Sequence, residues 1–459
     1  MSFLRFLAVV GLSAFFVGCG DEVVETDSGA TLWARRFGRG NDVEPVGLAG
    51  VESGGVIVAG RLYGDADLGG GTLPGPGNNY QAYVARYDGE GRHVYSRSFG
   101  DVFAEGANDV AALPDGSALV AGTYGFQIEL DDVSLLSDGR DDAFAVKLDP
   151  AGKVVWARSF GGAGHQRAVA IAALPDGGAI VAGMSSDELR LGTGEPEDTG
   201  FGLPFLVRLG ADGALLWSRV LHSEPGFTFV HDVAAQGDVI AVVGTFSHSL
   251  DLGFGTEIVT AMSVDGFVAV YDLEGKPLRG RPIGDPSSYD HVTAVAFTGD
   301  GGLVFTGDAQ GNVDLGGGIL SSSTDVDMNT YLLELDAPLN HRRSALYGGD
   351  KPDTGNGLAT ASDGSVILTG AMHGHMSFGT ATLAASEEGD AFVAKLDADR
   401  NPVFLRRIGG TDAQSGLRAV VDGEGRVYIA GMARGVVDFG LGPTEASGYY
   451  ETFVVGFAP

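Results

Sequence analysis

The residues best placed to do chemistry are acids that precede an apolar segment in most copies of a long internal repeat. They are Asp42, Glu105, Asp290, Asp353 and Asp412. If the repeats close into a ring, these acids stand around one mouth of a central channel. A ring of carboxylates would bind a cation such as Ca²⁺, or a basic peptide. The alternative is that each acid caps its own turn and faces water.

Other candidates for catalysis or metal binding are sparse. His373 and His375 would share one face of a strand, but no third ligand follows them. Residues Asp325–Asn329 have the opening spacing of a calcium loop, but Thr330 stands where such a loop needs glycine. No GxSxG motif occurs, and no serine and histidine are spaced as a triad would be. We therefore predict no catalytic residue, no enzyme activity and no cofactor other than calcium at the acids.

Composition and charge limit the class of protein. The 459 residues are 44% hydrophobic and include 75 glycines, which indicates many short apolar strands joined by tight turns. The formal net charge is −31. Such a surface repels nucleic acids and anionic membrane faces, so neither is an expected partner.

The single cysteine lies at the end of a short leader. An apolar run from Phe6 to Val17 follows Arg5 and is too short for an ordinary membrane span. The segment Phe16-Val17-Gly18-Cys19 resembles the lipobox of bacterial lipoproteins, although leucine is usual where Phe16 stands. The resemblance implies that residues 1–18 are a signal peptide and that Cys19 is lipidated. The alternative is a plain secretory signal with an incidental cysteine.

This leader predicts that the protein is located in the bacterial cell envelope. Residues 19–30 would form an acidic tether, and the lipid would be the only contact with the membrane. Gly20 follows the cysteine, which by the same resemblance favours the outer over the inner membrane.

Two short patterns recur seven times after the leader. The first is a strand ending in glycine, at spacings of 61 to 63 residues: 58–60, 120–122, 181–183, 242–244, 305–307, 368–370 and 429–431. The second is a strand led by an aromatic residue: Tyr83, Phe144, Phe205, Phe267, Tyr331, Phe392 and Phe453. A sustained long period indicates a repeat architecture. Each copy holds four strand-like segments, of which the first is rich in small residues and suits the innermost position.

The incomplete copy decides how the repeats are arranged. The last copy ends after its third strand at Phe457, whereas residues 32–38 are a fourth strand with no repeat before them. Pairing these two segments would complete a seventh blade and leave no open sheet edge. We therefore predict an all-β, seven-bladed β-propeller of four-stranded antiparallel blades over residues 31–459, with the last blade closed by the N-terminal strand.

The segments DAFAVKLDPAG, VVWARSFGG and ALPDGGAIVAG resemble SBBP-type propeller repeats of bacterial secreted proteins, and are most similar to lipoproteins of myxobacterial type. The resemblance implies the fold and carries over no catalytic residue. The three tryptophans and the arginine that recurs in the fourth strand are expected to pack and to form ion pairs between blades.

The function that we expect is that of a non-enzymatic, monomeric lipoprotein that binds a protein or glycan partner. The alternative is an envelope hydrolase or lyase that uses acids at the channel mouth. That activity would require several carboxylates to converge, with at least one buried enough to raise its pKa.

Overall fold

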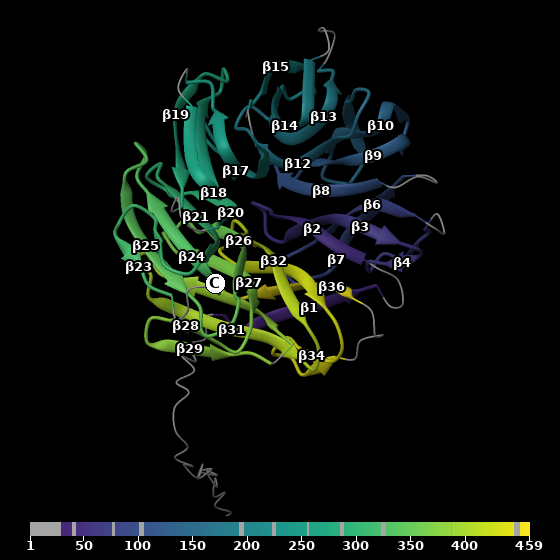
Figure 1. Ribbon diagram of the computed structural model, residues 1–459. Helices are drawn as coiled ribbons and strands as arrows, with labels where there is room; N and C mark the ends of the chain where they lie inside the picture. Colours follow the sequence, from purple (N-terminus) through teal and green to yellow (C-terminus); the bar gives the residue numbers. More distant parts are fainter. Residues whose placement is uncertain are drawn as a thin grey trace, which may run out of the picture.

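The computed structural model describes residues 29–38, 43–75, 79–100, 105–191, 197–222, 226–254, 257–284, 289–322, 327–386, 388–444 and 450–459. This part of the chain forms strands and no helix, and it contains no helix able to cross a membrane. Seven four-stranded antiparallel blades surround a central axis (Figure 1). The predicted fold class is confirmed.

The strands of each blade are named here a to d from the axis outward. Blade 1 is β2 (Val43–Gly50), β3 (Val56–Tyr63), β6 (Tyr80–Tyr87) and β7 (His93–Phe99). Blade 2 is β8 (Glu105–Ala112), β9 (Ala118–Leu130), β10 (Val133–Leu148) and β11 (Val154–Phe160). Blade 3 is β12 (Gln166–Ala173), β13 (Ala179–Leu189), β14 (Glu197–Leu209) and β15 (Leu215–Val220). Blade 4 is β16 (Thr228–Gln236), β17 (Val239–Asp251), β18 (Glu257–Asp272) and β19 (Pro277–Ile283).

The remaining blades follow the same order. Blade 5 is β20 (Asp290–Phe297), β21 (Leu303–Gln310), β24 (Met328–Leu335) and β25 (His341–Tyr347). Blade 6 is β26 (Thr354–Thr360), β27 (Val366–Met372), β30 (Asp390–Leu396) and β31 (Pro402–Gly410). Blade 7 is β32 (Gln414–Val421), β33 (Val427–Ala433), β36 (Glu451–Phe457) and β1 (Thr31–Phe37). Each a strand contacts the a strands of both neighbouring blades, so these seven strands form the inner ring.

Small hairpins join strands b and c in four blades. They are β4–β5 (Ala66–Asp67 and Thr72–Leu73), β22–β23 (Val313–Asp314 and Ile319–Leu320), β28–β29 (His375–Phe378 and Ala381–Ala384) and β34–β35 (Val437–Asp438 and Pro443–Thr444). In blades 2 to 4, strands b and c themselves run on as a longer ladder. The blades therefore differ from one another mainly in these b–c connections.

The N-terminal strand closes the ring as predicted. Strand β1 pairs antiparallel with β36, from Thr31 opposite Phe457 to Phe37 opposite Thr452. The Ala458 amide also donates to the Ala30 carbonyl over 2.9 Å. This pairing covers the edge that β36 would otherwise expose.

The two recurring sequence patterns meet inside every blade. The glycine of strand b lies opposite the aromatic residue of strand c, as Gly122 lies opposite Phe144. A Cβ at Gly122 would lie 2.2 Å from the Gly106 carbonyl oxygen and 2.5 Å from the Phe144 ring. Glycine is therefore required there, and the aromatic ring covers the gap it leaves.

Tryptophan and arginine side chains of strand d contact the next blade from every blade except blade 5, where Ala345 stands at the arginine position. The Trp156 indole donates to the Ala211 carbonyl over 2.9 Å, and Arg158 Nε donates to the Gly213 carbonyl over 2.7 Å. Equivalent bonds to the next blade's c–d turn are made by Trp33, Trp217, Arg35, Arg97, Arg219 and Arg281. Arg406 donates to the Gly29 carbonyl, just before β1 of blade 7. The predicted packing role is confirmed, but most of these acceptors are backbone carbonyls and not the carboxylates of ion pairs.

Candidate functional site

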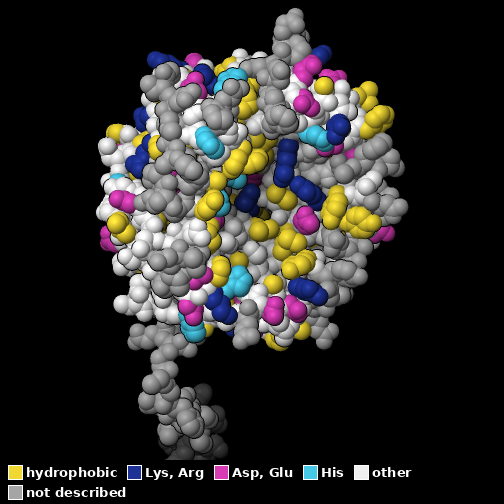
Figure 2. Space-filling view, viewed as in Figure 1, with side chains coloured by type: hydrophobic (Ala, Val, Ile, Leu, Met, Phe, Trp, Pro, Cys, Tyr) yellow, Lys and Arg dark blue, Asp and Glu magenta, His cyan; other side chains and the backbone are white. Residues whose placement is uncertain are grey.

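The channel mouth lies at the end of the ring where the a strands begin. It is defined here by the residue that follows the glycine of each strand b and the strand a residue paired with it. The seven pairs are Glu44–Arg61, Gly106–Thr123, Arg167–Met184, Phe229–Thr245, His291–Asp308, Thr354–Ala371 and Ser415–Met432. Charged and aromatic residues come from blades 1, 3, 4 and 5, so the mouth is chemically uneven. In Figure 2 the face shown is hollowed at its centre, and basic and hydrophobic side chains gather around the hollow.

Arg61 is held over the neighbouring blade by a fixed acceptor. Its Nη2 donates to Asn108 Oδ1 over 3.1 Å. The Asn108 amide nitrogen donates in turn to Thr123 Oγ1 over 3.0 Å and to the Ala168 carbonyl over 2.7 Å, which fixes its oxygen toward Arg61. A Cβ on Gly106 would lie 2.7 Å from Arg61 Nε, so this glycine gives the arginine room to cross β8.

Arg167 lies on β12 of blade 3, and part of its side chain is exposed at the mouth. Burial among its neighbours lowers the pKa of Arg167, and the Arg61 guanidinium lowers it further. The two like charges are therefore close enough to repel each other.

Two phenylalanines form an apolar shelf on blade 4, beside the blade that carries Arg167. Phe227 is 40% exposed and Phe229 is 48% exposed, and their ring centroids are 5.4 Å apart. On blade 5, His291 Nδ1 and Asp308 Oδ2 form an ion pair at 2.9 Å, and this hydrogen bond raises the pKa of His291. Burial lowers the pKa of the neighbouring His231 to about 4.

Three charged residues occupy the deeper part of the inner ring. A β-bulge shifts the register in every a strand, and the residue after it is Asp109 in blade 2, Asp232 in blade 4 and Arg418 in blade 7. Burial raises the pKa of Asp109 to about 7 and that of Asp232 to about 6, and Arg418 opposes both shifts. The three charges therefore interact across the channel.

The two aspartates also join neighbouring blades. Asp109 Oδ2 accepts from the Ile171 amide over 2.9 Å, and Asp232 Oδ2 accepts from the Val295 amide over 2.9 Å. The equivalent residues in the other four blades are glycine or alanine: Gly47, Ala170, Ala294 and Gly357. These acids were missed at the sequence level because the bulge breaks the two-residue alternation of the strand.

Three of the five predicted acids share one place at the start of an a strand, where they are buried and do not face water. Glu105, Asp290 and Asp353 are 2%, 1% and 0% exposed, so the expectation that each acid faces water is wrong for these three. Asp353 accepts from the amides of His373 over 2.9 Å and Gly349 over 3.1 Å, and burial raises its pKa to about 7.

The other two predicted acids do not join this group. Gln414 stands at the equivalent place in blade 7, and Asp412 lies two residues before it. Asp42 and the predicted lipidation site Cys19 lie outside the described residues. Within the described residues, no three His, Cys, Asp or Glu side chains gather as metal ligands.

A second set of buried polar residues was also missed. Each lies two residues before the aromatic of strand c: Gln81, Asp142, Asp265, Asn329, Asp390 and Glu451. A Cβ on Gly161 would lie 2.0 Å from Asp142 Oδ2, and one on Gly409 would lie 2.5 Å from Asp390 Oδ1, so each acid packs on the glycine that follows the last large apolar residue of strand d. This contact explains the recurring aromatic-glycine pattern. Six of seven copies have an acid or amide at this position, and that regularity was the available signal.

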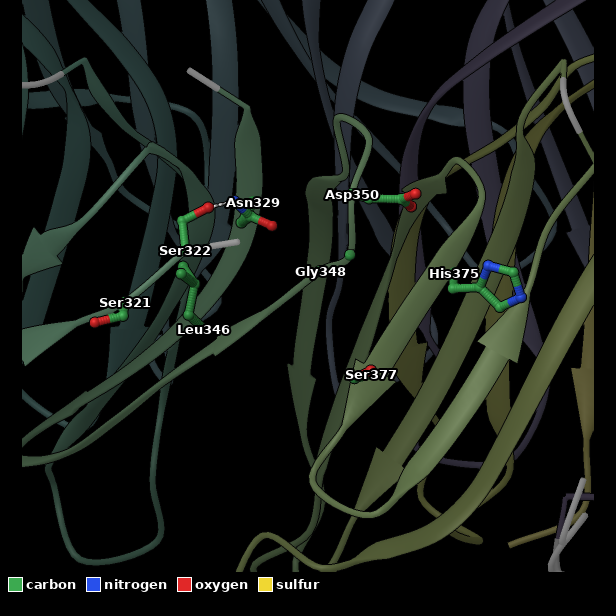
Figure 3. Close-up of a pocket in the computed structure, with 9 residues that line it drawn as sticks. Ser321, Ser322, Asn329, Leu346, Gly348, Asp350, His375 and Ser377 are labelled. Carbon is green, nitrogen blue, oxygen red and sulfur yellow. Dashed lines mark hydrogen bonds between the residues drawn. The ribbon is translucent and has the colours of Figure 1, made fainter. Parts of the chain in front are cut away.

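The outer grooves between blades repeat with the fold. The groove in Figure 3 has a volume of about 580 Å³ and lies between strand d of blade 5 and the small hairpin of blade 6. Asn329 donates to Ser322 Oγ over 2.8 Å on one side, while His375 stands apart on β28. Matching grooves of about 700 and 290 Å³ follow strand d of blades 7 and 6. A groove present at several blade junctions belongs to the architecture.

Comparison with known proteins adds little beyond the fold. The chain matches no known family. It is 24% identical over 403 residues to the regulatory protein FlaEY of Caulobacter vibrioides, and the match covers 82% of this chain and 41% of that protein. The chain thus spans about two-fifths of the length of that relative.

The chain is also similar to solved structures of low sequence identity. The Pan2 WD40 domain of Neurospora crassa is 8% identical, with a TM-score of 0.47, and the match covers 91% of this chain and 89% of that one. Sqt1 from Chaetomium thermophilum is 14% identical, with a TM-score of 0.45 and coverage of 95% and 99%. The chain is a seven-bladed β-propeller on the strength of its own strand pairings.

Proposed function

We propose that this protein is a non-enzymatic binding or scaffold module that receives a protein or glycan partner at the channel mouth. The observation that carries the proposal is the shelf of Phe227 and Phe229, which leaves 40% and 48% of these large side chains exposed. Exposed aromatic residues beside an arginine are typical of binding surfaces, where they become buried on association. A regulatory role exerted through binding is also compatible with the partial likeness to FlaEY.

A hydrolase or lyase is the less favoured function. The channel acids with raised pKa values, Asp109 and Asp232, both accept backbone hydrogen bonds from a neighbouring blade. This use of the carboxylates supports a structural role.

The cell envelope is the proposed location, with Cys19 as the lipidated anchor. Metabolic labelling with a palmitate analogue should mark the wild-type chain and not the Cys19→Ala variant. Equal labelling of the two chains would contradict the anchor.

Site-specific photocrosslinking in cells tests the binding role. A benzoylphenylalanine at position 229 should form a discrete crosslinked product. The matched control places the same group at Val155, which is 57% exposed on the outer strand β11. Equal products from both positions, or none from either, would contradict a partner at the mouth.

A further inference from the structure

Two arginines place positive charge at the channel mouth of a strongly acidic protein. The chain has 60 Asp and Glu residues and 29 Lys and Arg residues, and several of its arginines pair with carboxylates. Arg36 pairs with Glu451 at 3.1 Å, Arg407 with Asp390 at 2.6 Å, and Arg426 with Asp422 at 2.9 Å. Among the described residues, neither Arg61 nor Arg167 makes an ion pair, although Glu44 is the cross-strand neighbour of Arg61.

The geometry around Arg61 leaves this charge ready to bind an anion. Asn108 occupies one of its terminal nitrogens and is itself locked by Thr123 and Ala168. A side chain fixed in this way loses little conformational freedom on binding. The repulsion between Arg61 and Arg167 would be relieved by a negative charge placed between them.

The phenylalanine shelf limits the kind of anion. It lies on blade 4, directly after the blade of Arg167, so a ligand bound by the arginines extends over apolar rings. A free inorganic anion would leave this shelf exposed. A peptide that places a carboxylate next to an apolar side chain would satisfy the guanidinium groups and cover the rings together.

We propose that the channel mouth binds an acidic peptide segment, with a carboxylate between Arg61 and Arg167 and a neighbouring apolar side chain on Phe227 and Phe229. This inference rests on the proposed binding function and names the chemistry of its partner. The net charge of −31 adds a consequence for specificity, because an acidic peptide is repelled by the rest of the surface and is attracted only at the mouth.

Fluorescence anisotropy with synthetic peptides tests the proposal on the folded chain. The probe is a labelled peptide of alternating Glu and Leu, compared with matched Gln–Leu and Glu–Ser peptides. We expect the Glu–Leu peptide to bind, and each of the other two to bind about tenfold or more weakly, because one loses the charge and the other the apolar contact. Binding should also weaken as salt increases.

Variants of the protein distinguish binding at the mouth from a general effect of the protein's surface charge. Arg61→Gln and Arg167→Gln should each weaken Glu–Leu binding about tenfold and leave Gln–Leu binding unchanged. The matched control is Arg92→Gln, since Arg92 is an exposed arginine that already pairs with Asp88 at 2.7 Å. Phe229→Ala should reduce the difference between the Glu–Leu and Glu–Ser peptides.

The outcomes distinguish this inference from the function on which it rests. Absence of Glu–Leu binding, or equal loss with Arg92→Gln, overturns the acidic peptide. Tighter binding of oligogalacturonate than of any peptide overturns it in favour of an anionic glycan. If these results came with a discrete crosslink from position 229, the binding module would stand and only its ligand class would be wrong.

Discussion

The half-buried Asp109 carboxylate makes the stability of the ring depend on pH. Burial raises its pKa from 3.8 to about 7 in the folded chain. Between about pH 4 and pH 7 the folded state therefore retains a proton that the unfolded chain has released. Stability should be greatest at the acidic end of this window and should fall as the pH rises toward 7.

The magnitude follows from the difference between the two pKa values. About three pKa units correspond to a ceiling of about 4 kcal/mol above pH 7. Asp109 retains some contact with the channel and faces Arg418, so we expect about 2 to 4 kcal/mol. For a domain of this size the unfolding entropy is roughly 0.9 kcal/mol per kelvin, so the effect corresponds to about 2 to 5 °C in Tm.

The variant Asp109→Asn isolates this effect. The amide oxygen can still accept from the Ile171 amide, but the side chain carries no charge at any pH. From pH 5 to pH 8, the free energy of unfolding of the variant should rise by about 1 to 3 kcal/mol relative to that of wild type, because part of the effect of Asp109 is already present at pH 5. Urea unfolding at pH 5 and at pH 8, monitored by tryptophan fluorescence, measures this gain in stability.

The matched control has the opposite sign. Asp115 accepts from the Ser117 amide over 2.8 Å, and this bond lowers its pKa. Asp115→Asn should therefore destabilise the protein at pH 7 and have less effect at pH 3. If Asp109→Asn changed stability equally at pH 5 and pH 8, the argument that Asp109 is a buried and protonated acid would be refuted.

Three further variants test the packing of the blades, each by urea unfolding. Trp33→Ala should cost about 3 to 5 kcal/mol, because Trp33 packs on Tyr87 and Tyr428 at the junction of blades 7 and 1, and an unchanged midpoint would argue against the closure. Gly122→Ala should cost about 1 to 3 kcal/mol, because the new Cβ clashes with the Gly106 carbonyl. Gly237→Ala is the control without a clash, since a Cβ there meets no atom within 4 Å and only the positive φ of Gly237 opposes the change. Phe126→Gly should stabilise the folded protein by about 1 kcal/mol, because Phe126 has a φ of 54° at a place where four other blades have glycine. A loss of stability would show that the contacts of the Phe126 ring outweigh the backbone strain.

The fold was predictable because its signals repeat. Seven copies of the strand b glycine and of the strand c aromatic set the number of blades. The unpaired fourth strand around Trp33 and the missing fourth strand after Phe457 then required the closure that the structure has. Each of these signals lies on one strand and is independent of the exact register between strands.

The mouth was less predictable because it depends on register and on single blades. The a-strand bulge moves Asp109 and Asp232 to places that simple alternation does not give. Arg61 and Arg167 lie on different strands of different blades, and only the ring brings them together. The sequence singles out the acids at positions 105, 290 and 353 as a group, but their burial depends on how deeply the start of each a strand lies within the ring.

The pairing of β1 with β36 has a consequence for how the chain reaches its folded state. The first strand of the propeller must wait for the last, since Thr31 lies opposite Phe457. Contacts so distant in sequence form slowly, and blades 1 to 6 can assemble while β32 and β33 still lack their outer partners. Until synthesis is complete, the ring is open, and an unpaired sheet edge is exposed at each of its two ends. The pairing of β1 with β36 that closes the ring is therefore also the step at which two incompletely folded molecules could exchange strands.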